Sequence, residues 1–169
     1  MSEWRARLAV ILAGTGVGAA LDSGTKSVAE TMLDPSRTPF IPFVDLSLVY
    51  NRGISFSLFA TRDASETVLL VGIQAVLVLV LSFWALRARG GMEVVALTAV
   101  LSGAVGNLLD RVPDGAVTDF LHLHALGRSL FTFNLADVWI SAGVALLLVD
   151  ALRRPTPPRT EDHLASRDA

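Results

Sequence analysis

Four long stretches of apolar residues divide the chain and predict four helices. The longest runs from Val68 to Leu86, nineteen residues without a charge, which measure about 28 Å as a helix at ~1.5 Å per residue. That length matches a bilayer core of roughly 30 Å. The other stretches are shorter, and each taken alone also has the length of a buried core helix. Four spans is the most economical interpretation, and we place them at residues 8–26, 68–86, 94–109 and 138–152.

Segments between these stretches alternate apolar and polar residues, which predicts strands. Alternation runs through residues 44–50 and again through 117–123, and a third run, 129–133, follows a Leu-Gly-Arg turn. Such alternation is typical of a strand with one buried face. The predicted fold class is therefore an all-α membrane bundle of four transmembrane helices with a small extracytoplasmic β-layer. No internal repeat is visible, which disfavours a transporter built from inverted repeats.

Arginines beside the short connections predict the orientation in the membrane. Basic residues near span ends favour the cytoplasmic side, and all of these fall on one side of the predicted bundle: Arg5, Arg7, Arg87, Arg89, Arg153 and Arg154. Both termini are therefore expected in the cytoplasm. Residues 1–154 are predicted to form one integral-membrane domain, and the Pro-rich, polar residues 155–169 a disordered cytoplasmic tail. A cleaved N-terminal signal peptide is disfavoured, since no clear cleavage site precedes a soluble domain.

Composition supports a membrane protein and excludes several other classes. Hydrophobic residues make up 52% of the chain and charged residues 18%, against about 25% charged in soluble domains. The chain has no cysteine, which excludes a disulfide-stapled module, a thiolate metal site and acylation of this chain as a lipoprotein. Its net charge of −2 gives no electrostatic footprint for nucleic acid.

Polar residues gather at the outer ends of the predicted spans. Ionisable groups in or beside a span are costly, and they face the bundle interior or a wet cavity. Asp22 and Lys26 are one helical turn apart, so they lie on one helix face and can pair. The topology places the whole set at one outer depth: Asp22, Lys26, Asn107, Asp110, Asp119, Asn134 and Asp137. This convergence predicts a functional site.

Two carboxylates in one partly dehydrated site have a defined chemical use. Like charges held close cannot both ionise, so one aspartate keeps a proton while the other acts as a base toward water. This is the chemistry of aspartyl proteolysis, which needs neither metal nor cofactor. Spacing alone leaves a structural alternative open, in which the aspartates cap span ends or pair with Arg111 and Arg128. We expect Arg111 to anchor the third span through Asp110.

His122 and His124 share one face of a predicted strand, which is a spacing that suits a metal ion. No third ligand is evident in the sequence, and a zinc site needs at least three protein ligands. We therefore interpret this pair as part of a solvated strand face.

Five short motifs occur in order between residues 21 and 140. The first two are residues 21–26 (LDSGTK), which fit Asp-x-x-Thr-Lys, and residues 50–57 (YNRGISFS), which approach Asn-x-Gly-x-Ala-Phe-Ser. The third, residues 102–111 (SGAVGNLLDR), fits Gly-x-x-Gly-Asn-x-x-Asp-Arg. The last two are residues 117–120 (VTDF), which fit Val-x-Asp-Phe, and residues 133–137 (FNLAD), which fit Phe-Asn-x-Ala-Asp. Together they resemble the motifs of lipoprotein signal peptidase (signal peptidase II), a family of bacterial intramembrane aspartyl proteases. The sequence departs from the usual residues of these motifs at Ser23, Gly24 and Ser55. We expect these departures to affect packing in the first span and the fit of the substrate.

The resemblance implies an activity, a site and a location. It assigns the catalytic pair to Asp119 and Asp137. It implies a supporting or substrate-binding set of Asp22, Lys26, Asn51, Gly53, Asn107, Asp110, Arg111 and Asn134. The implied substrates are prolipoproteins carrying a diacylglyceryl group on the lipobox cysteine, cleaved just before that cysteine. The implied enzyme is a monomer in the lipid of the bacterial inner membrane, with no cofactor, a β-cradle and an active site near the outer face.

Two alternatives come from other functional classes. One is a small polytopic transporter or channel component with the aspartates along an ion path, and the other is a non-catalytic membrane scaffold. An ion path needs polar residues along the whole depth of the membrane, whereas residues 68–86 and 94–109 are apolar toward the cytoplasmic side. Retention of both Asp119 and Asp137 would be incidental in a scaffold.

Overall fold

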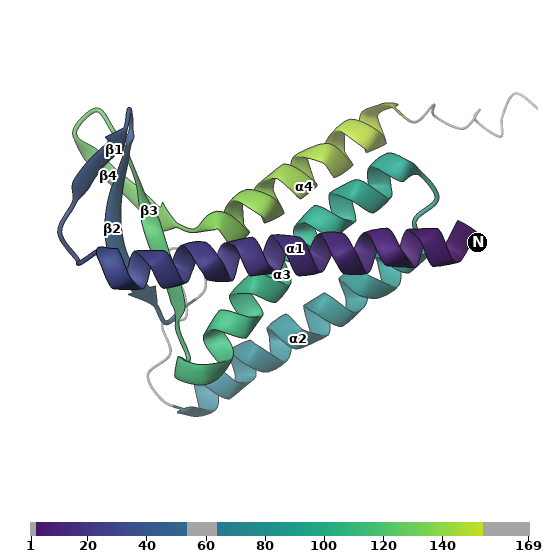
Figure 1. The fold of residues 1–169 in the computed structure, drawn as a ribbon, viewed down its shortest axis with the longest axis horizontal. Coiled ribbons are helices and arrows are strands. Elements are labelled where there is room, and N and C mark those ends of the chain that lie inside the picture. Colours follow the sequence, from purple (N-terminus) through teal and green to yellow (C-terminus); the bar gives the residue numbers. More distant parts are fainter. Residues whose placement is uncertain (1–2, 54–63, 154–169) are drawn as a thin grey trace, which may run out of the picture.

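The computed structural model describes residues 3–53 and 64–153, which form four helices and a small sheet (Figure 1). In chain order the elements are α1 (Glu3–Met32), β1 (Thr38–Ile41), β2 (Val44–Asn51), α2 (Ala64–Arg87), α3 (Gly91–Asp114), β3 (Val117–Ala125), β4 (Arg128–Phe133) and α4 (Leu135–Arg153). All four helices are long and apolar enough to cross a membrane. The four predicted helices are confirmed, and each helix extends beyond the apolar residues that predicted it. Ser55 and the predicted tail, 155–169, lie outside the described residues.

An antiparallel sheet in the order β1-β2-β3-β4 lies across one end of the bundle, which we call the sheet end (Figure 1). The three predicted strands are confirmed as β2, β3 and β4. The sequence did not predict β1, because this strand of four exposed residues contains Pro39 and shows no alternation in burial. Val49 of β2 pairs with Asp119 of β3, and Asn51 pairs with Val117. This register brings the end of β2 beside the first residues of β3.

Burial along β3 is more even than its alternating sequence predicts. Residues Val117 to Phe120 are all buried, so neither face of this part of the strand meets solvent. The Thr118 hydroxyl donates a hydrogen bond of 2.8 Å to Glu30 Oε1 at the end of α1, while Asp119 lines a cavity on the opposite face. Because α1 covers one face of β3 and the rest of the bundle covers the other, the polar side chains of this strand are buried as well.

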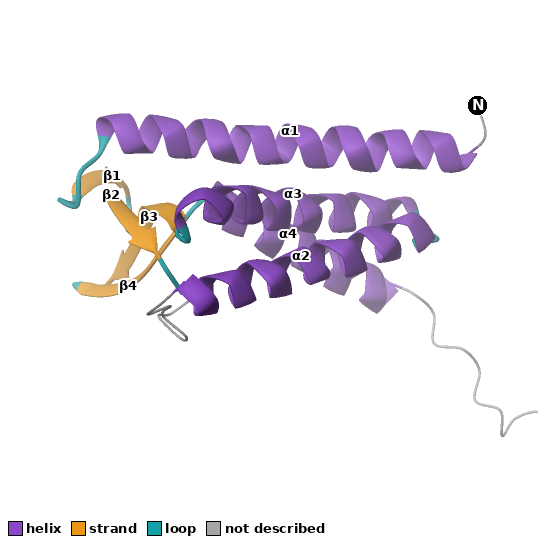
Figure 2. Cartoon of the chain, turned by 90° about the horizontal axis from the view of Figure 1, so that it is seen from below, coloured by secondary structure: helices purple, strands orange, loops and turns teal. Residues whose placement is uncertain are grey.

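The helix α3 is the centre of the bundle and packs against the other three helices. Figure 2 shows α1 as a separate layer beside α3. The contact between α3 and α4 is closest at Gly103, where an added Cβ would overlap the carbonyl oxygen of Ala136. At Gly106 an added Cβ would lie 2.7 Å from Asp22 Oδ2. These two glycines let α3 approach the start of α4 and the polar part of α1, which brings the polar side chains of three helices together.

Gly103→Ala should destabilise the protein by about 1–3 kcal/mol or more, because the new methyl group meets backbone and α4 must move away. Gly72→Ala on α2 is the matched control, since nothing lies within 4 Å of its added Cβ. That change should be neutral or stabilising by up to about 1 kcal/mol. Thermal unfolding in detergent measures both variants. Equal midpoints for Gly103→Ala and Gly72→Ala would contradict the close contact between α3 and α4.

Candidate active site

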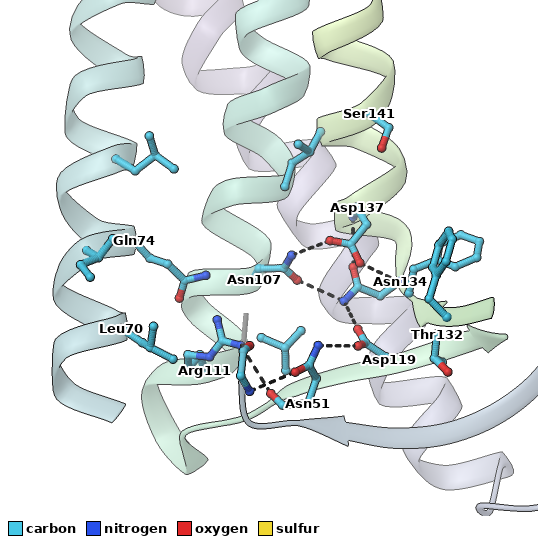
Figure 3. A pocket seen from close by; sticks show the side chains of 17 residues that line it. Asn51, Leu70, Gln74, Asn107, Arg111, Asp119, Thr132, Asn134, Asp137 and Ser141 are labelled. Atoms are coloured by element: carbon cyan, nitrogen blue, oxygen red, sulfur yellow. Dashed lines mark hydrogen bonds between the residues drawn. The ribbon is translucent and has the colours of Figure 1, made fainter. Parts of the chain in front are cut away.

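A cavity of about 560 Å³ lies where the sheet meets α2, α3 and α4. Apolar residues of α2, namely Leu70, Ile73 and Leu77, form one wall. The opposite wall is polar and holds most of the predicted site residues: Asn51, Gly53, Asn107, Arg111, Asp119, Asn134 and Asp137 (Figure 3). The other predicted residues, Asp22, Lys26 and Asp110, do not line the cavity and lie behind this wall.

Asp119 projects from β3 with both carboxylate oxygens hydrogen-bonded. Its Oδ1 accepts a bond of 2.7 Å from Asn134 Nδ2, and its Oδ2 accepts one of 3.1 Å from Asn51 Nδ2 (Figure 3). The residue is 3% exposed. Burial raises the pKa of Asp119 to about 7, and the negative charge of Asp137 contributes to the rise, while the bonds from Asn51 and Asn134 oppose it. A carboxyl in this environment can hold a proton near neutral pH.

Asp137 lies in the first turn of α4 and is fixed by a reciprocal pair of bonds with Asn134. Asn134 Oδ1 accepts from the Asp137 N–H at 3.1 Å, and Asp137 Oδ2 accepts from the Asn134 N–H at 3.2 Å. This is the capping-box arrangement, which satisfies two backbone donors at the start of a helix. Asp137 Oδ1 accepts a third bond, of 3.1 Å, from Asn107 Nδ2. The orientation of this carboxylate is therefore set by helix capping and by α3 together.

Lys26 determines which way the Asn107 carboxamide faces. Its ammonium group lies 2.9 Å from Asn107 Oδ1, and a lysine can only donate hydrogen bonds. The Asn107 carbonyl must therefore face Lys26, which turns its NH₂ group toward Asp137. Asn134 Nδ2, at 3.2 Å, is a second donor to the same Asn107 oxygen. A chain of polar contacts thus runs from α1 through α3 to the Asp137 carboxylate.

The expected pair of Asp22 and Lys26 is confirmed, with 2.7 Å between Asp22 Oδ2 and Lys26 Nζ. Asp22 Oδ1 also accepts a bond of 2.8 Å from the Ala136 N–H at the start of α4. Asp110 Oδ2 lies 3.2 Å from the same lysine and accepts a bond of 2.7 Å from the Thr118 N–H. One cation therefore lies between two carboxylates, and these carboxylates hold the starts of α4 and β3.

The expectation that Arg111 anchors α3 through Asp110 is wrong. Arg111 Nη2 instead donates to the carbonyl oxygens of Gly53, at 2.8 Å, and Asn51, at 3.4 Å, while Asp110 pairs with Lys26. The spacing of α3 separates the two side chains, since neighbouring residues on a helix do not face each other. Arg111 therefore holds the chain just after β2, and Asn51 Oδ1 bonds the Gly53 N–H at 3.0 Å in the same turn.

The predicted solvated histidine face is wrong for His122, which is buried. Its Nδ1 lies 3.1 Å from Thr132 Oγ1 and its Nε2 lies 3.2 Å from Ser129 Oγ. A bulge separates Leu123 from His124, and His124 Nε2 lies 3.3 Å from Asp45 Oδ1. Across residues 3–53 and 64–153 no group of three His, Cys, Asp or Glu side chains is placed to hold a metal ion.

Three polar residues line the cavity without having been singled out in the sequence: Gln74 of α2, Thr132 of β4 and Ser141 of α4 (Figure 3). Ser141 follows Asp137 by one helical turn. Gln74 interrupts the apolar residues 68–86, and this interruption was the available signal. Ser141 has the same one-turn spacing that brought Asp22 to Lys26, so its distance from Asp137 along the helix was the available signal for this residue.

The fold and the cavity define a polytopic membrane protein in which a buried aspartate, Asp119, and a partly buried one, Asp137, face one chamber. A family model described as Signal peptidase (SPase) II matches residues 14–153. The lipoprotein signal peptidase of Methylobacterium sp. (strain 4-46) is 44% identical over 135 residues, 78% of this chain and 82% of that protein. That of Rhodopseudomonas palustris (strain TIE-1) is 34% identical over 143 residues, 80% and 87% of the two chains. This chain therefore belongs to the signal peptidase II family.

The fold also resembles a solved structure, that of a bacterial membrane enzyme determined at 2.3 Å resolution. The TM-score is 0.74 at 22% sequence identity, over 89% of this chain and 94% of that chain. This likeness confirms the predicted fold class of four apolar helices with a small antiparallel sheet.

Proposed function

We propose that this bacterial inner-membrane protease uses Asp119 and Asp137 as its catalytic pair to remove signal peptides from prolipoproteins. The activity follows from membership of the signal peptidase II family. The observation that carries the residue assignment is the fixed geometry of the pair. All four carboxylate oxygens accept a hydrogen bond, and both side chains face the same cavity. Such preorganisation is what proton transfer in a transition state requires.

The two aspartates are assigned different roles by their surroundings. Asp119 holds the proton, because its pKa of about 7 keeps the carboxyl protonated below neutral pH and about half protonated at neutral pH. Asp137 is the base that takes a proton from water as the water oxygen attacks the scissile carbonyl carbon. Asp119 donates a hydrogen bond to the carbonyl oxygen and transfers its proton as the tetrahedral intermediate forms. When the C–N bond breaks, the proton held by Asp137 passes to the leaving amine, and one hydroxyl of the intermediate returns its proton to Asp119, which restores the starting protonation of the pair.

The shape of the cavity supports entry of the substrate from the lipid. The cavity is lined by α2 and α4, which each pack on α3 and make little contact with one another. An apolar signal helix can approach between these two helices and bring its end to the aspartates. With both termini in the cytoplasm, the sheet end is the extracytoplasmic end, and the scissile bond is cut near that membrane surface, before the diacylglyceryl cysteine. The enzyme acts as a monomer in contact with membrane lipid.

The supporting residues act on the pair rather than on the peptide bond. Asn51, Asn107 and Asn134 orient the two carboxylates, Lys26 orients Asn107, and the remaining charged residues hold strand and helix ends in register. The experiment that tests the function is cleavage of a diacylated prolipoprotein by purified enzyme in detergent, followed by gel shift.

Cleavage should fall as pH rises above about 7. Burial and the charge of Asp137 raise the pKa of Asp119, so the protonated, active form is present below that pKa and is lost above it. kcat/KM should then decrease about tenfold per pH unit on the alkaline side. Asn51→Ala removes a hydrogen bond that lowers this pKa, so its alkaline limb should move to higher pH. A flat profile to about pH 9, measured on purified enzyme, would contradict the protonated role of Asp119.

A further inference from the structure

Gln74 is a polar residue of α2 whose presence the fold of that helix does not explain. It lies among the uncharged residues 68–86, a stretch in which Ser82 also has a polar side chain. Ser82 is satisfied within its own helix, since its hydroxyl donates a bond of 2.7 Å to the Val78 carbonyl. Gln74 Oε1 is buried and accepts no hydrogen bond from the described residues. A buried carboxamide oxygen without a partner costs free energy, so a functional reason for the residue is required.

Gln74 lies in the wall of the cavity, and this position indicates a function for the residue there. Its side chain extends from the apolar wall formed by Leu70, Ile73 and Leu77 toward the side of Asn107 (Figure 3). Gln74 is therefore a hydrogen-bonding group on the wall that faces the aspartates. A substrate lying between the two walls would have carboxylates and asparagines on one side and this single carboxamide on the other.

A peptide that is cut in this cavity has backbone groups that lack hydrogen-bond partners. To expose its scissile bond the substrate must be extended there, so its N–H and C=O groups lose their helical partners. At membrane depth each unpaired backbone group costs several kcal/mol. A glutamine carboxamide offers both donors and an acceptor, and it therefore matches an N–H or a C=O of an extended peptide. Its long side chain reaches into the cavity from a helix whose own backbone is fully bonded.

We propose that Gln74 is a substrate-binding residue that hydrogen-bonds the main chain of the peptide segment carrying the scissile bond. The inference rests on the proposed catalytic function of this cavity and adds a specific contact to it. Binding is to the backbone, so it does not depend on which side chains the substrate carries at this position.

The first test compares Gln74→Met, which keeps the length and removes the hydrogen bonds, with Ser82→Ala on the same helix. A lost bond to a buried peptide group corresponds to about a 5- to 100-fold decrease in kcat/KM. Gln74→Met should show this decrease on a diacylated lipobox peptide, and Ser82→Ala should not. The thermal unfolding midpoint of Gln74→Met should stay at or above that of the wild type, since a buried polar group is removed.

The second test asks whether the contact is made to the backbone. Substrates in which one peptide bond near the cut is replaced by an ester lose an N–H donor and carry a weaker C=O acceptor. At one position the ester should reduce kcat/KM for the wild type and have little further effect on Gln74→Met. Full activity of Gln74→Met, or an undiminished ester effect in that variant at every position, overturns the proposal. Cleavage by Asp119→Asn would instead overturn the catalytic assignment, so the two failures are distinguishable.

Discussion

Asp119→Asn abolishes cleavage of a diacylated prolipoprotein, with an expected loss of at least about a thousandfold. An asparagine has the shape of the aspartate and can still meet the carboxamides of Asn51 and Asn134, but it has no acidic proton to give to the substrate. Asp137→Asn should be equally inactive, because an amide is not a base. The Asn134–Asp137 capping contacts have an oxygen acceptor available in that variant, so α4 should still form.

The matched control is Asp45→Asn. Asp45 lies on β2 of the same sheet, beside His124, and does not line the cavity. This variant makes the same change from a carboxyl to a carboxamide and should cleave at the wild-type rate. Gel shift of the prolipoprotein measures all three variants, and unfolding midpoints verify that each is folded. Robust turnover by either active-site variant would remove that residue from the catalytic pair.

Lys26→Met should be the most destabilising single substitution in the polar network. Lys26 is 3% exposed and is the cation for both Asp22 and Asp110. Breaking a buried ion pair by removing one partner costs about 3–5 kcal/mol, since the other charge is left uncompensated. The loss should appear as a lower unfolding midpoint, and cleavage should fall as well because the Asn107 carbonyl then keeps only the weaker of its two donors, Asn134 Nδ2.

A double variant separates charge from packing in this prediction. Lys26→Met combined with Asp22→Asn removes the buried charge that the single change leaves behind, so the double variant should be less destabilised than the sum of the two single changes. Additive losses would show that the ion pair with Asp22 contributes little and that Lys26 acts through its contacts with Asn107 and Asp110. Chemical unfolding in a fixed detergent gives the comparison.

The elements of the fold were largely predictable because their signals are local. Long apolar stretches mark the helices, and alternation marks β2, β3 and β4. The helix ends were not predictable in the same way. In α1 the buried pair of Asp22 and Lys26 compensates its own charges and lets the helix continue to Met32. The short, exposed β1 carries no such pattern and forms through its pairing with β2.

Which residues form the site was predictable from the sequence, but the contacts between these residues were less so. Spacing along the helices brought Asp22 to Lys26 and Asn134 to Asp137, since both pairs are about one turn apart. The contacts between elements depend on how helices rotate about their axes, which a single sequence does not determine. Arg111 consequently bonds the end of β2 instead of Asp110, and the choice of Asp119 and Asp137 among the aspartates came from the family motifs rather than from spacing.

The hydrogen bond from the Ala136 N–H to Asp22 can form only after the last helix has been synthesised. It joins the first helix to the last, and Asp119 and Asp137 come from elements synthesised before and after β4. During translation the chain therefore inserts three of its helices without a complete pair of aspartates. On the proposed assignment of Asp119 and Asp137, the catalytic pair is complete only when α4 has docked on α1, so a nascent chain that still lacks α4 should not cut neighbouring signal peptides.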